Sequence, residues 1–259
     1  MTQPVFSFRT ESITHPGKVR KINEDSLFAR AKHGIWLVAD GMGGHRDGNV
    51  ASSMIAEAAG RLNAGKNLIP DFVACIKDVN QRLIAMSGGV HERIVGSTVN
   101  ALIIQGSHYT CLWAGDSRCY LIRGGKIEQQ SRDHTEAEEL LSAGAITAEE
   151  ASVWPRRNVI TRAVGADQDI ELASREGEVE AGDLFLLCSD GLTGHVSDAE
   201  ILAFSSDRTP HLLCEALLGL ALERGGKDNI SIIALQVVEQ GKTRVLDSPW
   251  KTVKNTADE

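Results

Sequence analysis

Four carboxylates of the sequence lie where an apolar segment meets a glycine-containing turn: Asp40, Asp116, Asp190 and Asp228. The segment before Asp40, residues 35–39, reads Ile-Trp-Leu-Val-Ala, and short apolar runs of this kind predict buried strands. A carboxylate at the end of a buried strand stays charged only if a cation, an arginine or backbone N–H groups pair with it. Taken singly, Asp40 is equally well explained as an ordinary turn aspartate.

The repetition of this pattern at four positions favours a functional site over four unrelated turn aspartates. If the four strands share a core, their ends can meet at one pole of the molecule. The sequence has no comparable cluster of histidine or cysteine. Carboxylate oxygens suit hard divalent ions, Mg²⁺ or Mn²⁺, rather than zinc or copper. The sequence therefore predicts a carboxylate-rich metal site, without ranking the two metals.

The composition indicates one globular domain and excludes several classes of function. The chain has 259 residues, 42% of them hydrophobic, which is enough for a substantial core. A net charge of −8 without a basic block argues against nucleic-acid binding. We expect no signal peptide in residues 1–16 and no membrane span. The five cysteines have no CxxC spacing, which predicts buried, reduced thiols and a cytoplasmic location.

The order of the predicted elements indicates an α+β fold. Strands follow one another without intervening helices, which predicts antiparallel pairing rather than a doubly wound parallel sheet. A two-glycine connection, Gly124-Gly125, predicts a β-hairpin. The expected strands are 6–12, 26–29, 35–39, 97–104, 109–114, 119–123, 126–129, 184–188 and 230–235. The expected helices are 50–62, 70–86, 136–145, one beginning after the capping box at 147–150, 197–204 and 210–223.

Residues 131–165 interrupt this pattern with short helical segments and the positively charged stretch Trp154-Pro155-Arg156-Arg157. The insertion is equally well explained as a mobile flap over the site or as a long surface excursion. We expect one domain over residues 1–240 and a flexible C-terminal tail over 241–259, although Trp250 could dock.

Six motifs occur in an order that resembles the metal-dependent PPM/PP2C-type serine/threonine protein phosphatases, in particular the compact bacterial kind. The resemblance covers residues from about 5 to 238. The motifs are Asn23-Glu24-Asp25, Ala39-Asp40-Gly41-Met42-Gly43-Gly44, Gly96-Ser97-Thr98, Gly115-Asp116-Ser117-Arg118, Ser189-Asp190-Gly191-Leu192 and Asp228-Asn229. The resemblance implies two antiparallel β-sheets packed as a sandwich and flanked by helices, an α-β-β-α arrangement, with residues 131–165 as the variable flap.

The resemblance also implies a role for each matching residue. Asp40, Asp190 and Asp228 would supply carboxylates to a two-metal centre, and Gly41 would add its backbone carbonyl. Asp116, with Asp190, would hold a third and weaker ion. Around them the resemblance places an outer shell and a phosphate-binding arginine: Glu24, Asp25, Asn229 and Arg20. Without the resemblance, Arg20 and the Glu24-Asp25 pair would be interpreted as a solvated face.

The implied chemistry is hydrolysis of phosphoserine and phosphothreonine. Two divalent ions about 3.5–4 Å apart can bridge a water and make it hydroxide near neutral pH. Hydroxide attacks phosphorus in line, so no covalent intermediate forms and no side-chain nucleophile is needed. Arg20 can hold the phosphoryl oxygens with its planar fork. The metals and the arginine together neutralise charge on the equatorial oxygens.

One position departs from the eukaryotic pattern. Some family members carry a general-acid histidine two residues after the first metal aspartate, where this chain has Met42. We interpret His45 and His134 as loop histidines, and a metal-bound water is the default proton donor. Ser97-Thr98 is interpreted as a core pair that supports the site, not as a nucleophile.

The expected partners are phosphoserine and phosphothreonine proteins, including a cognate serine/threonine kinase and its targets, with a monomeric chain. Two other hypotheses stay open at this point. One is a pseudophosphatase that binds phosphoproteins without turnover, although all five metal positions are filled. The other is a metal-dependent phosphoesterase for small esters.

Overall fold

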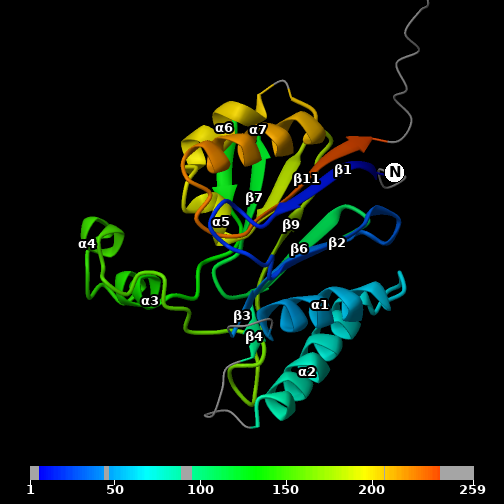
Figure 1. Cartoon of the computed structure of the whole chain (residues 1–259). Helices are drawn as coiled ribbons and strands as arrows, with labels where there is room; N and C mark the ends of the chain where they lie inside the picture. The colour runs from blue at the N-terminus through cyan, green and yellow to red at the C-terminus, as the bar shows by residue number, and fades with distance from the viewer. Residues whose placement is uncertain (1–5, 44–46, 89–94, 207, 240–259) are drawn as a thin grey trace, which may run out of the picture.

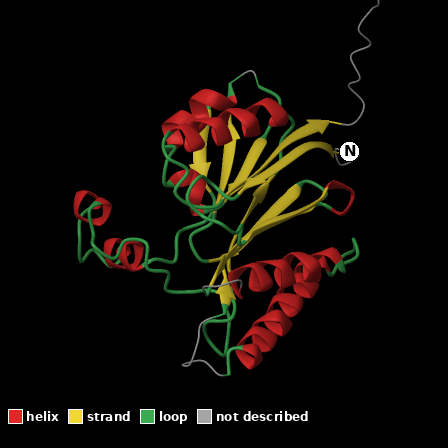
Figure 2. Cartoon of the chain, in the orientation of Figure 1, coloured by secondary structure: helices red, strands yellow, loops and turns green. Residues whose placement is uncertain are grey.

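Two antiparallel β-sheets pack face to face in the computed structural model, and helices cover the outer face of each sheet (Figures 1 and 2). The structure describes residues 6–43, 47–88, 95–206 and 208–239. The expected α-β-β-α sandwich is confirmed. Within the described chain, no helix is long and apolar enough to cross a membrane.

The first sheet has the strand order β1-β11-β10-β7-β8. Its strands are β1 (Phe6–His15), β7 (Arg118–Arg123), β8 (Lys126–Gln129), β10 (Leu184–Cys188) and β11 (Ile230–Glu239). The outer face of this sheet packs against α6 (Asp198–Ser205) and α7 (Pro210–Glu223), and the four-residue α5 (Asp190–Thr193) follows β10. The strands at the two ends of the described chain, β1 and β11, pair over their full lengths. The first and last described segments therefore lie side by side in the same sheet.

The second sheet has the order β2-β3-β5-β6-β9, and the short β4 pairs with β3. Its strands are β2 (Asp25–Arg30), β3 (Ile35–Met42), β4 (Gly96–Ser97), β5 (Val99–Gln105), β6 (His108–Ala114) and β9 (Ala173–Glu178). The helices α1 (Asp47–Gly60) and α2 (Leu68–Met86) cover its outer face, and a 3₁₀ turn, η1 (Ala31–His33), joins β2 to β3.

Residues 35–39 of β3 and the whole of β10 are apolar because both faces of these strands are buried. In β3, Ile35 and Leu37 face the helices, whereas Trp36 and Val38 face the opposite sheet. The strand β10 alternates in the same way, with Phe185 in the layer between the sheets. Side chains of successive strand residues point to opposite faces, so a strand sandwiched between two cores needs a continuous apolar run. This double burial fixes the strand ends from which the candidate site residues project.

The segment between β8 and β9 leaves the sandwich and carries α3 (Glu136–Ser142) and α4 (Ala148–Ser152), which project to one side (Figure 1). Thr147 and Glu150 form the expected capping box of α4. Two isolated bridges, Thr135 to Ile160 and Ser97 to Val164, tie the segment's ends together and to the sheet.

Several expectations need correction. The strand β3 does not stop at Asp40 but continues to Met42, because β4 pairs with its last two residues. The expected strand 97–104 is divided into β4 and β5 at Thr98. The strand β9 and the helix α5 were not expected. The described cysteines are all free, and all but the half-buried Cys75 are buried, as the sequence predicted.

Buried Asn80 of α2 anchors the chain where it returns from the projecting segment. Its Nδ2 donates to the carbonyls of Asp167 (2.8 Å) and Gln168 (3.2 Å), and its Oδ1 accepts from the N–H of Gly165 (2.6 Å). We expect Asn80→Ala to lower the free energy of unfolding by about 2 kcal/mol, since it leaves the buried N–H of Gly165 unpaired. Chemical denaturation measures this loss. Gln81→Ala is the matched control: it removes one exposed hydrogen bond to Gln168 and should cost about 0.5 kcal/mol or less. Equal losses would contradict the anchoring role.

Candidate metal centre

The carboxylates that the sequence places at strand ends meet at one end of the sandwich. Asp25, the first residue of β2, lies opposite Asp40 of β3 in the antiparallel register. Burial raises the pKa of Asp40 well above its usual range, and the charges of Asp25, Asp190, Asp116 and Asp228 raise it further. These five carboxylates therefore form one electrostatic cluster, as the sequence predicted for four of them.

The backbone of Asp40 is held by Thr98, at the junction of β4 and β5. The Oγ1 atom of Thr98 accepts from the N–H of Asp40 (3.0 Å), and the N–H of Thr98 donates to the Asp40 carbonyl (2.8 Å). The same hydroxyl lies 2.7 Å from that of Ser117, next to Asp116. Thr98 thus couples two acidic strand ends, which agrees with the supporting role expected for the Ser97-Thr98 pair.

Asp25 is buried and is held from the other sheet. Its Oδ2 accepts from the hydroxyl of Ser189 (2.8 Å), the residue before Asp190, and that hydroxyl accepts from the N–H of Ser231 (3.0 Å). Burial raises the pKa of Asp25 to about 6, and the hydrogen bonds to Ser231 and Ser189 oppose the rise. Asp25 is therefore a link between the two sheets as well as a member of the cluster.

Asp116 and Asp190 form the part of the cluster nearest the projecting segment. Burial raises the pKa of Asp116 to about 7, and the charges of Asp190 and Asp133 add to the effect. The pKa of Asp190 is raised by burial and by Asp228, while its interactions with Asp40 and Arg20 lower it. Closely spaced acids of this kind are costly unless a positive charge neutralises them.

Asp228 lies beside the predicted phosphate-binding arginine. Its Oδ2 accepts from a guanidinium nitrogen of Arg20 at 2.7 Å, and the Arg20 side chain is 53% exposed. The next residue, Asn229, accepts from the N–H of Glu24 (2.8 Å) and donates to the carbonyls of Pro16 and Ile22 (both 3.0 Å). Asn229 thereby fixes the loop that carries Arg20.

Two glycines allow these loops to approach closely. A Cβ atom on Gly41 would lie 2.0 Å from the carbonyl oxygen of Gly48 and 2.6 Å from that of Glu24. A Cβ atom on Gly191 would lie 1.9 Å from the carbonyl oxygen of Asn229. Both contacts are with backbone and cannot be relieved by a side-chain rotation. The absence of a side chain at Gly191 therefore allows the Asp190 and Asp228 loops to lie against each other.

The donor set fits hard divalent cations. Three buried carboxylate oxygens have no hydrogen-bond partner within the described chain: Glu24 Oε1, Asp25 Oδ1 and Asp116 Oδ1. Unpaired buried carboxylate oxygens are the ligands that Mg²⁺ and Mn²⁺ take. Among the residues that the structure describes, no group of three His, Cys, Asp or Glu side chains is gathered closely enough to hold a metal ion as it stands. Both oxygens of Asp228 accept hydrogen bonds in this structure, Oδ2 from Arg20 and Oδ1 from the N–H of Asn229 (2.9 Å).

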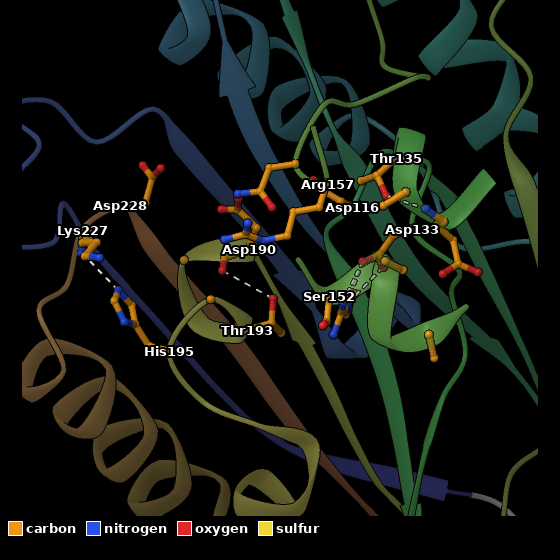
Figure 3. A pocket seen from close by; sticks show the side chains of 18 of the residues that line it. Asp116, Asp133, Thr135, Ser152, Arg157, Asp190, Thr193, His195, Lys227 and Asp228 are labelled. Carbon is orange, nitrogen blue, oxygen red and sulfur yellow. Dashed lines mark hydrogen bonds and ion pairs between the residues drawn. The ribbon is translucent and has the colours of Figure 1, made fainter. Parts of the chain in front are cut away.

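A cavity of about 770 Å³ opens beside the cluster (Figure 3). Its floor includes Asp116, Asp190 and Asp228, and its walls come from the projecting segment on one side and from α5 and the α7–β11 loop on the other. We call this cavity the flap groove. It places an open site directly against the carboxylates.

Two of the described histidines near the cluster, His134 and His195, accept hydrogen bonds from backbone N–H groups. His45 lies outside the described residues. His134 accepts from the N–H of Gly115 through Nδ1 (3.2 Å), and burial lowers its pKa to about 4, so the ring is neutral at pH 7. The Nε2 atom of His195 accepts from the N–H of Lys227 (3.2 Å). His134 and His195 therefore act as structural acceptors, which agrees with the interpretation of His134 as a loop histidine.

The sequence analysis missed the residues that fix the acids in place. They are the hydroxyls of Ser117, Ser189 and Ser231 and the ion pair of Arg118 with Asp133 at 2.7 Å. Ser117, Arg118 and Ser189 belong to the quoted motifs, but their partners are distant in sequence. Only the recurrence of a hydroxyl residue beside two of the acids, Ser117 after Asp116 and Ser189 before Asp190, could have indicated this role.

Comparison with known proteins gives a consistent result. The family model for protein phosphatase 2C matches residues 18–216. The serine/threonine protein phosphatase PstP of Mycobacterium tuberculosis is 35% identical over an alignment of 254 residues that covers 93% of this chain and 49% of PstP. The protein phosphatase PhpP of Streptococcus pneumoniae is 33% identical over 238 residues, 88% of this chain and 97% of PhpP. The chain thus spans about half the length of PstP and nearly all of PhpP.

The fold agrees with a solved structure as well. The catalytic domain of the serine/threonine protein phosphatase PstP, in complex with two manganese ions, superposes with a TM-score of 0.81 and 33% identity. The match covers 91% of this chain and 100% of that one. The fold, the ordered motifs and the carboxylate cluster lead to the same conclusion: the chain belongs to the protein phosphatase 2C family.

Proposed function

We propose that this chain is a metal-dependent protein serine/threonine phosphatase. The observation that carries the proposal is the carboxylate cluster: Asp116, Asp190 and Asp228 line the groove, and Asp40 lies within reach of their charges. Family membership supports the reaction, and the two manganese ions bound by PstP support the cofactor, Mn²⁺ or Mg²⁺. The substrates are proteins that carry phosphoserine or phosphothreonine, including a cognate kinase and its targets.

The proposed ligands are the carboxylates of Asp40, Asp190 and Asp228 and the backbone carbonyl of Gly41, with Asp116 and Asp190 holding a third, weaker ion. When bound, two such ions supply Lewis acidity and activate water as the nucleophile. Glu24 and Asp25 belong to the proposed outer shell, where their carboxylates would accept hydrogen bonds from water. Asn229 positions the Glu24 backbone and the Arg20 loop.

Arg20 binds the phosphoryl group in this proposal. Its guanidinium donates to Asp228 through one nitrogen, and the half-exposed remainder is open toward solvent. A guanidinium offers five N–H donors in a fork, so it can serve a carboxylate and a phosphate oxygen together. Its charge stabilises the negative charge on the phosphoryl oxygens during transfer.

Three described thiols and the two serines beside the acids are not placed as covalent nucleophiles. The thiols of Cys119, Cys188 and Cys214 lie in the apolar core, where burial raises their pKa. The hydroxyls of Ser117 and Ser189 are buried and hydrogen-bonded to structural partners. These observations support direct attack by water, without a covalent intermediate.

The catalytic unit is proposed to be a single domain over residues 1–240, with residues 131–165 as the flap. The pairing of β1 with β11 supports one domain, because it joins the two ends of the described chain in one sheet. The position of α3 and α4 beside the groove supports a flap that contacts substrate. The tail, 241–259, lies outside the described residues.

Hydrolysis of a phosphothreonine peptide tests the proposal. We expect phosphate release from the purified chain with Mn²⁺ or Mg²⁺, its loss in EDTA, and its return when the metal is restored. Turnover should survive a serine/threonine phosphatase inhibitor of the okadaic type. Folded protein that binds the peptide without releasing phosphate would indicate a pseudophosphatase. Turnover of small phosphate esters alone would indicate a different phosphoesterase.

The third metal position leads to a graded prediction. We expect Asp116→Asn to lower kcat about tenfold or more while the two main ions still bind, because Asp116 is assigned to the third ion only. Isothermal titration with Mn²⁺ counts the ions, and steady-state kinetics gives kcat. Loss of all bound manganese in a folded variant would contradict the assignment.

A further inference from the structure

We propose that the flap groove selects phosphorylated segments with acidic side chains next to the phosphoresidue, through Arg157 and Lys227. This inference rests on the proposed phosphatase function and adds the class of substrate. Arg157 comes from the flap, in the loop that follows α4, and Lys227 precedes Asp228 in the α7–β11 loop. The two cations thus belong to the two walls that enclose the carboxylate floor.

Both side chains are exposed and line the groove together with Asp116, Asp190 and Asp228. Figure 3 shows Arg157 extending from the flap side and Lys227 lying beside His195 near Asp228. A phosphoresidue bound over the acidic floor would leave its chain neighbours along these walls. Side chains on either side of the phosphoresidue would therefore pass one cation or the other.

The other cations of the groove are already paired. Arg118 binds Asp133 at 2.7 Å, and Arg224 forms an ion pair with Glu200. Within the described chain, no carboxylate lies within ion-pair distance of Arg157 or Lys227, although the chain has more acids than bases. Two unpaired cations in a groove of a protein with a net charge of −8 are available for an anionic ligand.

The adjacent Arg156 makes the contrast clear. Its Nε lies 3.0 Å from a carboxylate oxygen of Glu136, and Arg156 does not line the groove. Two neighbouring arginines of the flap therefore have different surroundings: one is neutralised within the flap, and the other faces the substrate side. Arg157 can bind a carboxylate through two parallel N–H groups, whereas Lys227 acts as a compact charge.

Two phosphothreonine peptides test the inference. They are identical except that the residues before and after the phosphothreonine are glutamate in one and glutamine in the other. With the full chain and Mn²⁺, we expect kcat/KM for the acidic peptide to be about three- to tenfold higher, a range typical of exposed ion pairs. The preference should lie in KM, and it should shrink as ionic strength rises.

The variants assign the preference to the residues. Arg157→Gln and Lys227→Gln should each lower it, and the double variant should treat the two peptides alike. Arg156→Gln is the matched control and should keep the wild-type ratio. The glutamine peptide is the internal reference, so a general loss of activity cannot imitate the effect.

The failure of this inference differs from the failure of the proposed function. Metal-dependent hydrolysis of both peptides at equal rates, or an acidic preference that survives in the double variant, would overturn the role of these cations alone. No hydrolysis of either peptide with metal would overturn the phosphatase assignment itself. Conversely, Arg157→Glu should favour a third peptide with lysine neighbours, and an unchanged order of the three peptides would also contradict the inference.

Discussion

Asp190→Asn is expected to abolish turnover while the chain stays folded. Asp190 is the carboxylate assigned to more than one ion, and an amide cannot replace its charge. We expect kcat to fall by more than about a thousandfold, since even changes outside a ligand shell cost ten- to a hundredfold. Steady-state hydrolysis of a phosphothreonine peptide with saturating Mn²⁺ measures the loss.

The same substitution should not destabilise the protein in EDTA. The pKa of Asp190 is raised by burial and by the charge of Asp228, so keeping this carboxylate ionised lowers the stability of the folded chain. An isosteric amide removes that charge and its repulsion, so we expect an equal or higher free energy of unfolding. Asp169→Asn removes an equal charge from an exposed position outside the cluster and should change neither quantity. Near-normal kcat in folded, metal-loaded Asp190→Asn would refute the ligand assignment.

Gly191→Ala is expected to have the second largest effect. A methyl group there would lie 1.9 Å from the carbonyl oxygen of Asn229, so the loop of Asp190 and the start of β11 must separate. We expect a loss of about 2–3 kcal/mol in the free energy of unfolding, the usual cost of overpacking, and a loss of activity as the ligands move apart. Chemical denaturation and the Mn²⁺ dissociation constant measure the two effects.

Gly219→Ala provides the matched control. Gly219 is also helical, but it is exposed on α7 and an added Cβ would contact nothing within 4 Å. Alanine is the better helix former, so this substitution should stabilise the protein by up to about 1 kcal/mol. If Gly191→Ala were as harmless as Gly219→Ala, the close approach of the two loops would have no functional consequence.

The sequence predicts the strands of the sandwich well because they are strongly patterned, whereas their packing as two sheets was implied by the family resemblance. Both faces of β3 and β10 are buried, so each reads as a continuous apolar run that stops near an acid. The strand β9 reads Ala-Ser-Arg-Glu-Gly-Glu and was missed, because it is a largely exposed strand at the edge of its sheet. Edge strands carry charge and lack the apolar alternation on which such predictions depend.

Some residues of the candidate site can likewise be predicted from the sequence, and others cannot. The acids at strand ends can be found from the chain, since their position repeats beside glycine. Their supports cannot, because each joins distant residues: Ser189 binds Asp25 from 164 residues away, and Asn229 binds Glu24 from 205 residues away. Asn80 lies on a helix that was expected only to cover the core, yet it binds the backbone of Gly165 and Asp167 at the end of the flap. Its partners are backbone atoms, so no pattern of side chains in the sequence could indicate this contact.

The most direct test of the account is the location of bound manganese. Crystals of the chain grown with Mn²⁺ and measured with anomalous scattering should show two strong peaks bounded by Asp40, Asp190, Asp228 and the carbonyl of Gly41. A third, weaker peak is expected at Asp116. Peaks at other residues, or no manganese in a crystal of active enzyme, would contradict the assignment of the catalytic centre to these carboxylates.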